Sequence, residues 1–190
     1  MLPERALAFP VALRPLAHDD APRVQLLAGE RAVAEATALI PHPYPDGVAE
    51  AWIAAQAQDR AAGREYTYAI TLATEGLLVG AIGLRPAPTA QENMGYWIGQ
   101  AYWGRGYATA AAGAVIALAF SLLDLDLLTA SHLTRNPASG RVLEKCGFTL
   151  LRTERRAHRG LDEAFCVRGL TRSAWEQAAG DGVNAIARTL

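Results

Sequence analysis

Residues 95–120 read Gly-Tyr-Trp-Ile-Gly-Gln-Ala-Tyr-Trp-Gly-Arg-Gly-Tyr-Ala-Thr-Ala-Ala-Ala-Gly-Ala-Val-Ile-Ala-Leu-Ala-Phe, and this stretch decides the fold. Tyr96, Trp97 and Ile98 suit a pleated, half-buried surface and predict a strand. The Ala-rich sequence that follows Gly106 contains no proline and predicts a helix of about four to five turns. A strand, a tight glycine turn and a helix therefore follow one another directly.

The turn between this strand and this helix predicts an anion site. Gly104 and Gly106 allow the backbone amides to converge. The first N–H groups of a helix lack intrahelical partners and lie at the positive end of its dipole. A loop that merely turns tightly is the alternative. The dinucleotide pattern is missing because Thr109 stands where its third glycine would be, so we expect another phosphate-bearing ligand.

Length and composition limit the class of protein. A chain of 190 residues, 51% hydrophobic and 19% charged, is expected to form one domain. A net charge of −1 does not indicate a broad cationic face, so we expect no direct binding of nucleic acid. The sequence shows neither a spanning apolar run nor a signal-peptide pattern, which predicts a cytoplasmic protein without a membrane partner.

Cysteine and histidine usage predicts neither a disulfide nor a metal site. Cys146 and Cys166 form no Cys-x-x-Cys pair, and we expect buried, reduced thiols. The histidines are scattered without the spacing of metal ligands, so we expect no metal.

The order of elements predicts an α/β fold. Pro10 and Pro15 indicate that residues 9–16 form an edge strand. Three antiparallel strands precede the glycine turn, and the crossover over residues 95–133 predicts two parallel strands. We expect helices at 19–29, 46–63, 107–123, 137–146 and 173–179, and strands at 65–72, 77–85, 92–99, 125–133, 148–154 and 163–169.

Some local details of this order are also predicted. Asp19 or Asp20 and Asp46 are expected to cap the first two helices. Residues 155–160 are expected to form a polar turn, and the tail at 180–190 is expected to fray. The Pro-rich entry at 41–45 and the helix behind it suggest a lid over a substrate site, with a simple packing helix as the alternative.

Three motifs resemble the GCN5-related N-acetyltransferases (GNAT), and most closely the branch of ribosomal-protein N-terminal acetyltransferases similar to RimJ and RimL. The motifs lie at 95–99, 102–109 and 136–148, and the resemblance covers about residues 8–170. It implies a single acetyltransferase domain over residues 1–190. It also implies a mixed, mostly antiparallel central sheet of about seven strands, flanking helices, a splayed strand pair at the cofactor site, and acetyl-CoA as the acetyl donor.

The resemblance assigns roles to residues of this sequence. Asn136 matches an asparagine that binds the pantetheine, and Ser139 matches a serine beside the CoA sulfur whose hydroxyl can act as a general acid. Helix capping would also explain both residues. The backbone of Trp97, Ile98 and Gly99 would pair with the pantetheine as an added strand. The pyrophosphate would be held by the amides of Gly104, Arg105, Gly106, Tyr107, Ala108 and Thr109.

The chain departs from the family at two positions. Asn93 stands where the family often has a glutamate, so the usual carboxylate base is in doubt. Ala101 replaces a glutamine or arginine of the pyrophosphate motif, which costs one side-chain contact. His132 has a suitable intrinsic pKa and is a candidate base, with a structural role as the alternative. An α-amine with a pKa near 8 needs less help from a base than a lysine near 10.4.

We therefore expect an N-acetyltransferase that moves the acetyl group of acetyl-CoA to a primary amine by direct attack in a ternary complex. The amine acceptor is a protein N-terminus or a small molecule, and no residue pattern chooses between them. Because of Asn93, the alternative is a non-catalytic CoA-binding or sensor module of the same fold. The resemblance is also compatible with a homodimer.

Overall fold

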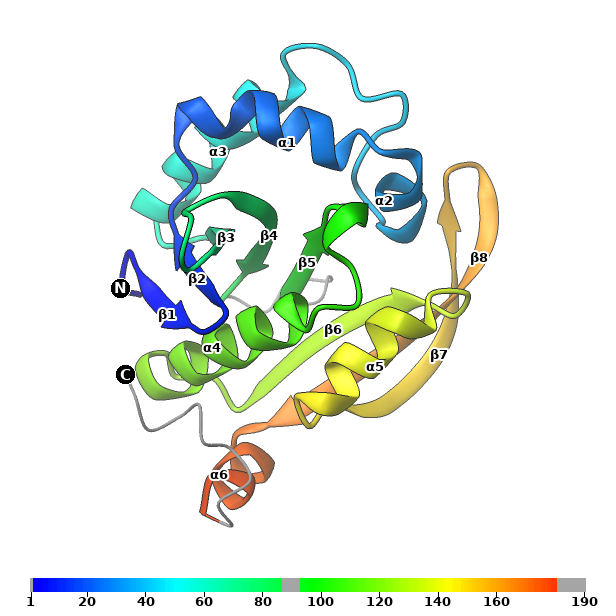
Figure 1. Ribbon diagram of the computed structural model, residues 1–190. Coiled ribbons are helices and arrows are strands. Elements are labelled where there is room, and N and C mark those ends of the chain that lie inside the picture. Colours follow the sequence, from blue (N-terminus) through cyan, green and yellow to red (C-terminus); the bar gives the residue numbers. More distant parts are fainter. Residues whose placement is uncertain (1, 87–92, 181–190) are drawn as a thin grey trace.

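The computed structural model describes residues 2–86 and 93–180, and in these residues the chain forms two antiparallel sheets with helices packed around them (Figure 1). This agrees with the predicted α/β class and with its mostly antiparallel sheet. The described residues contain eight strands where about seven were expected. The extra strand lies at the N-terminus, and of the tail predicted at 180–190 all but Gly180, the last residue of α6, lies outside the described residues.

The larger sheet has the strand order β1-β2-β3-β4-β5, and all neighbours are antiparallel. Gly80 of β4 lies beside a register shift between β3 and β4 and allows β5 to approach closely, because a Cβ atom there would lie 2.2 Å from the carbonyl oxygen of Trp97. The strands are β1 (Ala6–Ala8), β2 (Val11–Arg14), β3 (Tyr66–Leu72), β4 (Leu78–Leu84) and β5 (Met94–Ile98).

The predicted edge strand at 9–16 was wrong in one respect. Pro10 lies in the turn between β1 and β2, and β2 pairs with both β1 and β3. Pro15 follows the end of β2. Because both prolines lie outside the ladder, their missing N–H groups do not prevent β2 from being an inner strand.

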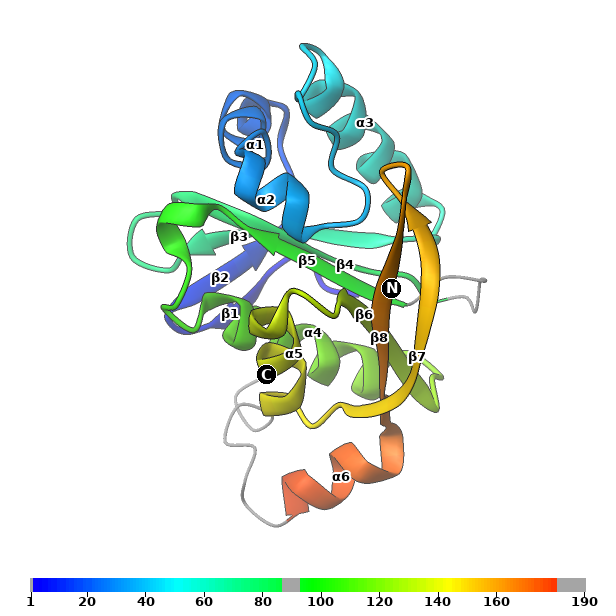
Figure 2. The ribbon, with the colours of Figure 1, turned by 90° about the vertical axis from the view of Figure 1, so that its right-hand side faces the viewer.

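The smaller sheet has the order β6-β8-β7, with β6 at Leu127–Leu133, β7 at Thr149–His158 and β8 at Leu161–Thr171. The crossover was expected to make β5 and β6 parallel strands of one mixed sheet, splayed at the cofactor site. The splay is present, but no ladder joins the two strands, so the sheet is divided in two. Among the described residues, β6 is paired with β8 alone. Side chains join β5 and β6 at one end, where the Thr129 amide donates to Asn93 Oδ1 at 3.2 Å. Beyond this contact the two sheets diverge (Figure 2).

Helices cover both faces of the larger sheet (Figure 2). On one face lie α1 (Ala21–Ala28), α2 (Arg31–Ala36) and α3 (Val48–Ala61). On the other lies α4 (Tyr107–Leu122), whose Ala-rich sequence is buried along most of its length, as expected for a helix that is apolar all round. Two further helices are α5 (Pro137–Lys145) and α6 (Arg172–Gly180), and the Trp175 ring of α6 lies 5.5 Å from that of Phe120.

Two predicted caps were wrong because the carboxylates have other partners. Asp20 forms an ion pair with Arg14 at 2.7 Å and accepts the Ala17 amide at 2.8 Å, so its side chain caps the short 3-10 helix His18–Asp20 and not α1. Asp46 accepts a hydrogen bond from Gln25 Nε2 at 2.7 Å, while Gly47 (φ 81°) precedes α3 without a side-chain cap. Caps predicted from local sequence can thus be overridden by partners distant in the chain.

The predicted polar turn at 155–160 was also wrong. Strand β7 continues to His158 and β8 begins at Leu161, so only Arg159 (φ 52°) and Gly160 (φ 76°) form the turn. Two consecutive residues with positive φ are the signature of a type I′ hairpin turn, whose twist matches that of the strands. The hairpin is consequently long and carries its tip to the α2 end of the molecule (Figure 1).

Candidate functional site

Free amides gather at the loop before α4. Gly104 (φ 75°) and Gly106 (φ 80°) adopt left-handed conformations that only glycine accepts without strain. No side chain caps α4, and the Ala110 amide, which bonds to the Gly106 carbonyl at 3.0 Å, is the first to turn back into the helix. Within the described part of the chain, no group accepts a hydrogen bond from the amides of 104–109. They remain available to an anion.

These amides line a cavity of about 290 Å³. Arg105, Arg141 and Lys145 also line it, whereas no carboxylate occurs among its described lining residues. Three cations beside the positive end of a helix favour a ligand with several negative charges. Sequence reasoning found Arg105 but missed Arg141 and Lys145, although their spacing of four on α5 places them on one helix face.

The edge of β5 offers backbone groups to this cavity. The Gly99 amide donates to the Val79 carbonyl at 2.9 Å, and the Arg85 amide donates to the Asn93 carbonyl at 2.8 Å. Because bonded pairs alternate along an antiparallel ladder, the N–H and C=O groups of Trp97 also face β4. The groups of Tyr96 and Ile98 face the open edge, where the Ile98 carbonyl accepts a bond from Trp103 Nε1 at 2.6 Å.

The predicted pairing set Trp97, Ile98 and Gly99 must therefore be corrected. Trp97 and Ile98 line the smaller cavity, but Gly99 is absent from its lining. A Cβ atom on Gly99 would lie 2.9 Å from a methyl group of Leu27, so this glycine serves close packing. The backbone groups left for an added strand are those of Tyr96 and Ile98, one residue out of the predicted register.

Ser139 lies in the first turn of α5 beside a buried tyrosine. The Ser139 Oγ and Tyr96 Oη atoms are 2.8 Å apart, and Tyr96 Oη also donates to the Ser139 carbonyl at 3.2 Å. Burial raises the pKa of Tyr96 to about 12, so its hydroxyl is protonated at neutral pH. Sequence reasoning treated Tyr96 as a strand residue, because nothing local shows that it meets Ser139.

Asn136 is the N-cap of α5, as its capping alternative predicted. Its Oδ1 atom accepts the Ser139 amide at 3.2 Å. Its Nδ2 atom donates to the Ala36 carbonyl at the end of α2, at 3.3 Å. Asn136 thus links the end of α2 to the first turn of α5, and one Nδ2 hydrogen remains for a ligand in the smaller cavity, which Asn136 lines.

A second cavity of about 540 Å³ meets the first at the Tyr96–Ser139 pair. The two cavities share Ala36, Thr37, Tyr96, Trp97 and Ser139 in their linings. The larger one is mainly apolar, and its aromatic lining residues are Tyr44, Trp52, Tyr96, Trp97 and Phe165. Its size and character are those of a site for a small molecule or a chain end.

Glu65 is the one carboxylate among the described residues that line the larger cavity. It forms an ion pair with Arg85 at 2.8 Å and accepts a bond from Thr67 Oγ1 at 3.1 Å. A Cβ atom on Gly83 would lie 2.9 Å from Glu65 Oε1, so this glycine makes room for the carboxylate. Gln56 Oε1 also lines this cavity and is buried without a hydrogen-bond partner.

His132 lines the larger cavity, yet both of its ring nitrogens have partners. Nδ1 lies 3.0 Å from the Leu133 carbonyl, and Nε2 accepts a bond from Arg168 Nε at 3.1 Å. This arrangement fixes the neutral tautomer with its proton on Nδ1. No lone pair of the ring is free to receive a proton from an amine unless the bond to Arg168 breaks.

Both polar atoms of the Asn93 side chain also have hydrogen-bond partners. Its Oδ1 accepts bonds from the amide and the hydroxyl of Thr129, at 3.2 and 2.9 Å, and its Nδ2 donates to the Arg85 carbonyl at 3.0 Å. The side chain therefore ties β4, β5 and β6 together at the point where the two sheets diverge. A carboxylate at this position could accept the hydrogen bonds from Thr129 but could not donate one to the Arg85 carbonyl.

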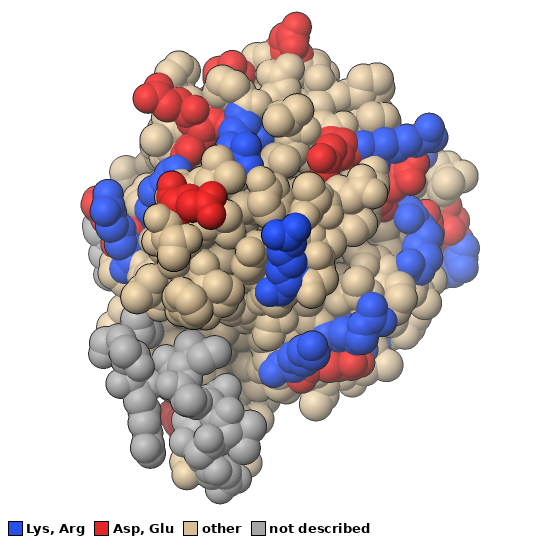
Figure 3. Space-filling model, in the orientation of Figure 1, with Lys and Arg blue, Asp and Glu red and all other residues tan. Residues whose placement is uncertain are grey.

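The remaining chemistry of the described residues is limited. Both cysteines are free thiols, and burial raises the pKa of Cys146 to about 11. No group of His, Cys, Asp and Glu among these residues could hold a metal ion. None of their helices has the length and apolar character needed to cross a bilayer. Figure 3 shows Lys and Arg interspersed with Asp and Glu on the face drawn, without one continuous basic surface.

Comparison with known proteins agrees with this geometry. A family model described as an acetyltransferase (GNAT) domain matches residues 11–149. RimL, a ribosomal L7/L12 alpha-N-protein acetyltransferase solved with coenzyme A, has a TM-score of 0.80 at 15% identity, over 90% of this chain and 99% of that one. RimJ of Mycobacterium smegmatis, solved with CoA-disulfide, has a TM-score of 0.76 at 20% identity, over 90% and 89%.

A third solved structure, the microcin C7 self-immunity acetyltransferase MccE in complex with acetyl-CoA and AMP, has a TM-score of 0.75 at 16% identity, over 86% of this chain and 93% of that one. At these identities the structural likeness establishes the fold. The family model covers most of the chain and includes the glycine turn and the Asn136 motif. The chain therefore belongs to the GNAT family of acetyltransferases.

Proposed function

We propose that this acetyl-CoA-dependent N-acetyltransferase acts on an α-amine or a comparable small primary amine that binds in the larger cavity. One observation carries the proposal. A cavity with free amides and three cations meets a second, mainly apolar cavity at a hydrogen-bonded Tyr96–Ser139 pair. This arrangement suits a donor and an acceptor that enter from different sides and react where the cavities join.

The residues of the smaller cavity fit a CoA donor. The amides of 104–109, with Arg105, Arg141 and Lys145 nearby, would hold the diphosphate. The edge amide and carbonyl of Tyr96 and the edge amide of Ile98, with the remaining Nδ2 hydrogen of Asn136, would hold the pantetheine arm. When bound, acetyl-CoA supplies the thioester that the amine attacks.

Ser139 is the proposed general acid. Its hydroxyl lies at the junction of the cavities. It would donate a proton to the departing sulfur while taking up the proton that the attacking nitrogen loses, so that the C–S bond breaks to a neutral thiol, the amide forms and the hydroxyl is restored. Tyr96, protonated because burial raises its pKa to about 12, holds the Ser139 hydroxyl in place through the 2.8 Å contact. A fixed hydroxyl loses less entropy on reaching the reactive geometry.

The amine must be neutral before it attacks. The geometry favours an acceptor amine that loses its proton without a strong general base. The side chain of Asn93 is hydrogen-bonded to Thr129 and Arg85. The ring nitrogens of His132 are hydrogen-bonded to Leu133 and Arg168. An α-amine with a pKa near 8 meets that condition better than a lysine near 10.4. We propose that His132 positions α5 through its packing against Gly140, where a Cβ atom would lie 2.9 Å from the ring.

A thiol-release assay tests this function. Acetyl-CoA is incubated with the protein and with a panel of peptides with free α-amines, small primary amines and α-acetylated peptides that keep a lysine. We expect thiol release with α-amines or small amines and little with the blocked peptides. Binding of acetyl-CoA without release by any amine would favour the sensor module. A cytoplasmic location and a homodimer remain predictions, which fractionation and sedimentation can test.

A further inference from the structure

A short segment lies over the junction of the two cavities. We call residues 34–41 the roof segment. It begins in the last turn of α2 and includes Ala36 and Thr37, which line both cavities, and Ile40, which lines the larger one. The carbonyls at the end of a helix lack intrahelical partners and need donors from elsewhere. Thr37 Oγ1 supplies one of them, donating to the Val33 and Ala34 carbonyls at 3.1 and 3.2 Å.

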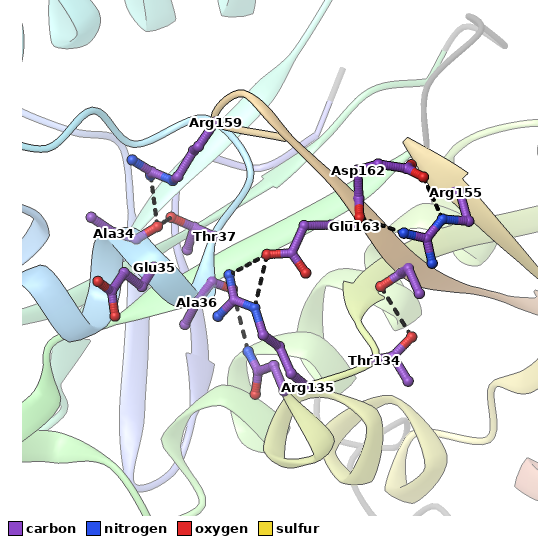
Figure 4. A network of polar contacts seen from close by, with 12 residues as sticks. Ala34, Glu35, Ala36, Thr37, Thr134, Arg135, Arg155, Arg159, Asp162 and Glu163 are labelled. Atoms are coloured by element: carbon purple, nitrogen blue, oxygen red, sulfur yellow. Dashed lines mark hydrogen bonds and ion pairs between the residues drawn. The ribbon is translucent and has the colours of Figure 1, made fainter. Parts of the chain in front are cut away.

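Two side chains from the C-terminal half hold the roof segment, and Figure 4 shows one of them, Arg159, beside Ala34. Arg159, at the tip of the β7–β8 hairpin, donates from Nη2 to the Ala34 carbonyl at 2.7 Å and also to the Ile40 carbonyl. Asn136 donates to the Ala36 carbonyl at 3.3 Å. One guanidinium therefore joins both ends of the roof segment. A cation at the end of α2 also suits the helix dipole.

The backbone of Arg159 is unusual. Among the described residues it is the only non-glycine with a positive φ, 52°. Glycine or asparagine would satisfy the first central position of a type I′ turn at lower cost. The turn itself thus gives no reason for an arginine here. Strain held at one residue points to a role for its side chain, and the contacts of this side chain lie in the roof segment.

We propose that Arg159 is a positioning residue that fixes the roof segment over the acceptor cavity and thereby determines which amines can enter it. The inference rests on the proposed function and deepens it. With the roof segment fixed, the cavity of about 540 Å³ admits an amine at the end of a slim, apolar group, such as a free amine or the first residue of a flexible chain. An internal lysine on a folded surface would not fit beneath the roof segment.

The Arg159→Gly variant tests this role without damaging the hairpin, because glycine relieves the positive φ while removing the guanidinium. Hydrogen exchange followed by mass spectrometry reports on the amides of 34–44. We expect their exchange in the variant to be roughly tenfold faster, since a hydrogen bond to a charged donor is lost, while the melting temperature is unchanged or higher. Arg155→Ala is the matched control, because Arg155 lies on the same hairpin but pairs with Asp162.

Steady-state kinetics separates an effect on binding of the acceptor amine from an effect on binding of acetyl-CoA. With an amine that the wild type accepts, Arg159→Gly should raise the KM for the amine several-fold, leave kcat and the affinity for acetyl-CoA near wild type, and widen the range of accepted amines. Unchanged exchange in 34–44, or an equal change in Arg155→Ala, would overturn the inference. An unchanged KM beside faster exchange would overturn the acceptor role alone. Failure of the wild type with every amine would overturn the proposed function, while the exchange experiment would still report on the roof segment.

Discussion

Gly95 offers a way to fill the acceptor cavity without disturbing the fold. It lies in β5, lines the larger cavity and is absent from the lining of the smaller one. A Cβ atom built on Gly95 meets no atom within 4 Å, and its φ is not left-handed. A larger side chain would consequently extend into the cavity rather than into the protein.

The expected magnitudes follow from this geometry. Replacing a strand glycine at a compatible φ reduces the entropy of the unfolded chain, so Gly95→Val should raise the free energy of unfolding by about 0.5 kcal/mol. The three added carbon atoms occupy space that an acceptor would otherwise fill. At about 0.8 kcal/mol per methylene, the acceptor loses about 2.4 kcal/mol of binding, which corresponds to a roughly fiftyfold higher KM.

The assay combines urea denaturation, thiol release at varied amine concentration, and calorimetry with acetyl-CoA. Gly80→Ala is the contrasting variant, because its Cβ atom would lie 2.2 Å from the Trp97 carbonyl and should cost about 1–3 kcal/mol of stability. Gly95→Val should retain stability and acetyl-CoA affinity while its acceptor KM rises. Loss of stability like that of Gly80→Ala, or an unchanged acceptor KM, would refute the reasoning.

Further variants test the proton path and the stability of the fold. Ser139→Ala should lower kcat by roughly a hundredfold with an unchanged acetyl-CoA affinity, and a wild-type kcat would remove Ser139 from the acid role. Tyr96→Phe should lower kcat by roughly tenfold, as loss of one hydrogen bond predicts, and its effect should vanish in the Ser139→Ala background. Asn93→Asp should lose about 1–3 kcal/mol of stability, because the Arg85 carbonyl loses its donor, and a gain in turnover would contradict the structural role of Asn93. Burial, aided by the charges of Arg159 and Arg135 and opposed by Glu163, lowers the pKa of buried His158. The unfolded chain therefore binds this proton more tightly, so unfolding free energy should fall as pH drops below about 6.5, and pH-dependent melting of His158→Gln should show a weaker fall.

The cluster of free amides before α4 could be predicted from sequence because its causes are local. Two glycines separated by one residue, followed by an Ala-rich helix, determine where the free amides lie. The capping role of Asn136 is local in the same way, because Asn136 Oδ1 accepts a hydrogen bond from the amide of Ser139, three residues later in the chain. The resemblance to the family then supplied the identity of the ligand.

The junction of the cavities could not be predicted in the same way. Tyr96 meets Ser139 across 43 positions of sequence, and Arg159 reaches Ala34 across 125. Periodicity and turn patterns say nothing about such pairs. The splay of β5 from β6 was expected from the resemblance, whereas the contact that joins them, between Asn93 Oδ1 and the amide and hydroxyl of Thr129, could not be predicted from local sequence.

We propose that the amides of 104–109 bind the diphosphate of the donor, and the rest of the site depends on this contact. Calorimetry with acetyl-CoA tests it in the wild type, in Gly106→Leu and in Gly76→Leu, a matched variant with a left-handed glycine and open space in the β3–β4 turn. We predict binding to the wild type and to Gly76→Leu, and binding roughly a hundredfold weaker to Gly106→Leu, as loss of two charge-assisted hydrogen bonds implies. No heat with the wild type, or equal affinity in all three proteins, would contradict the claim.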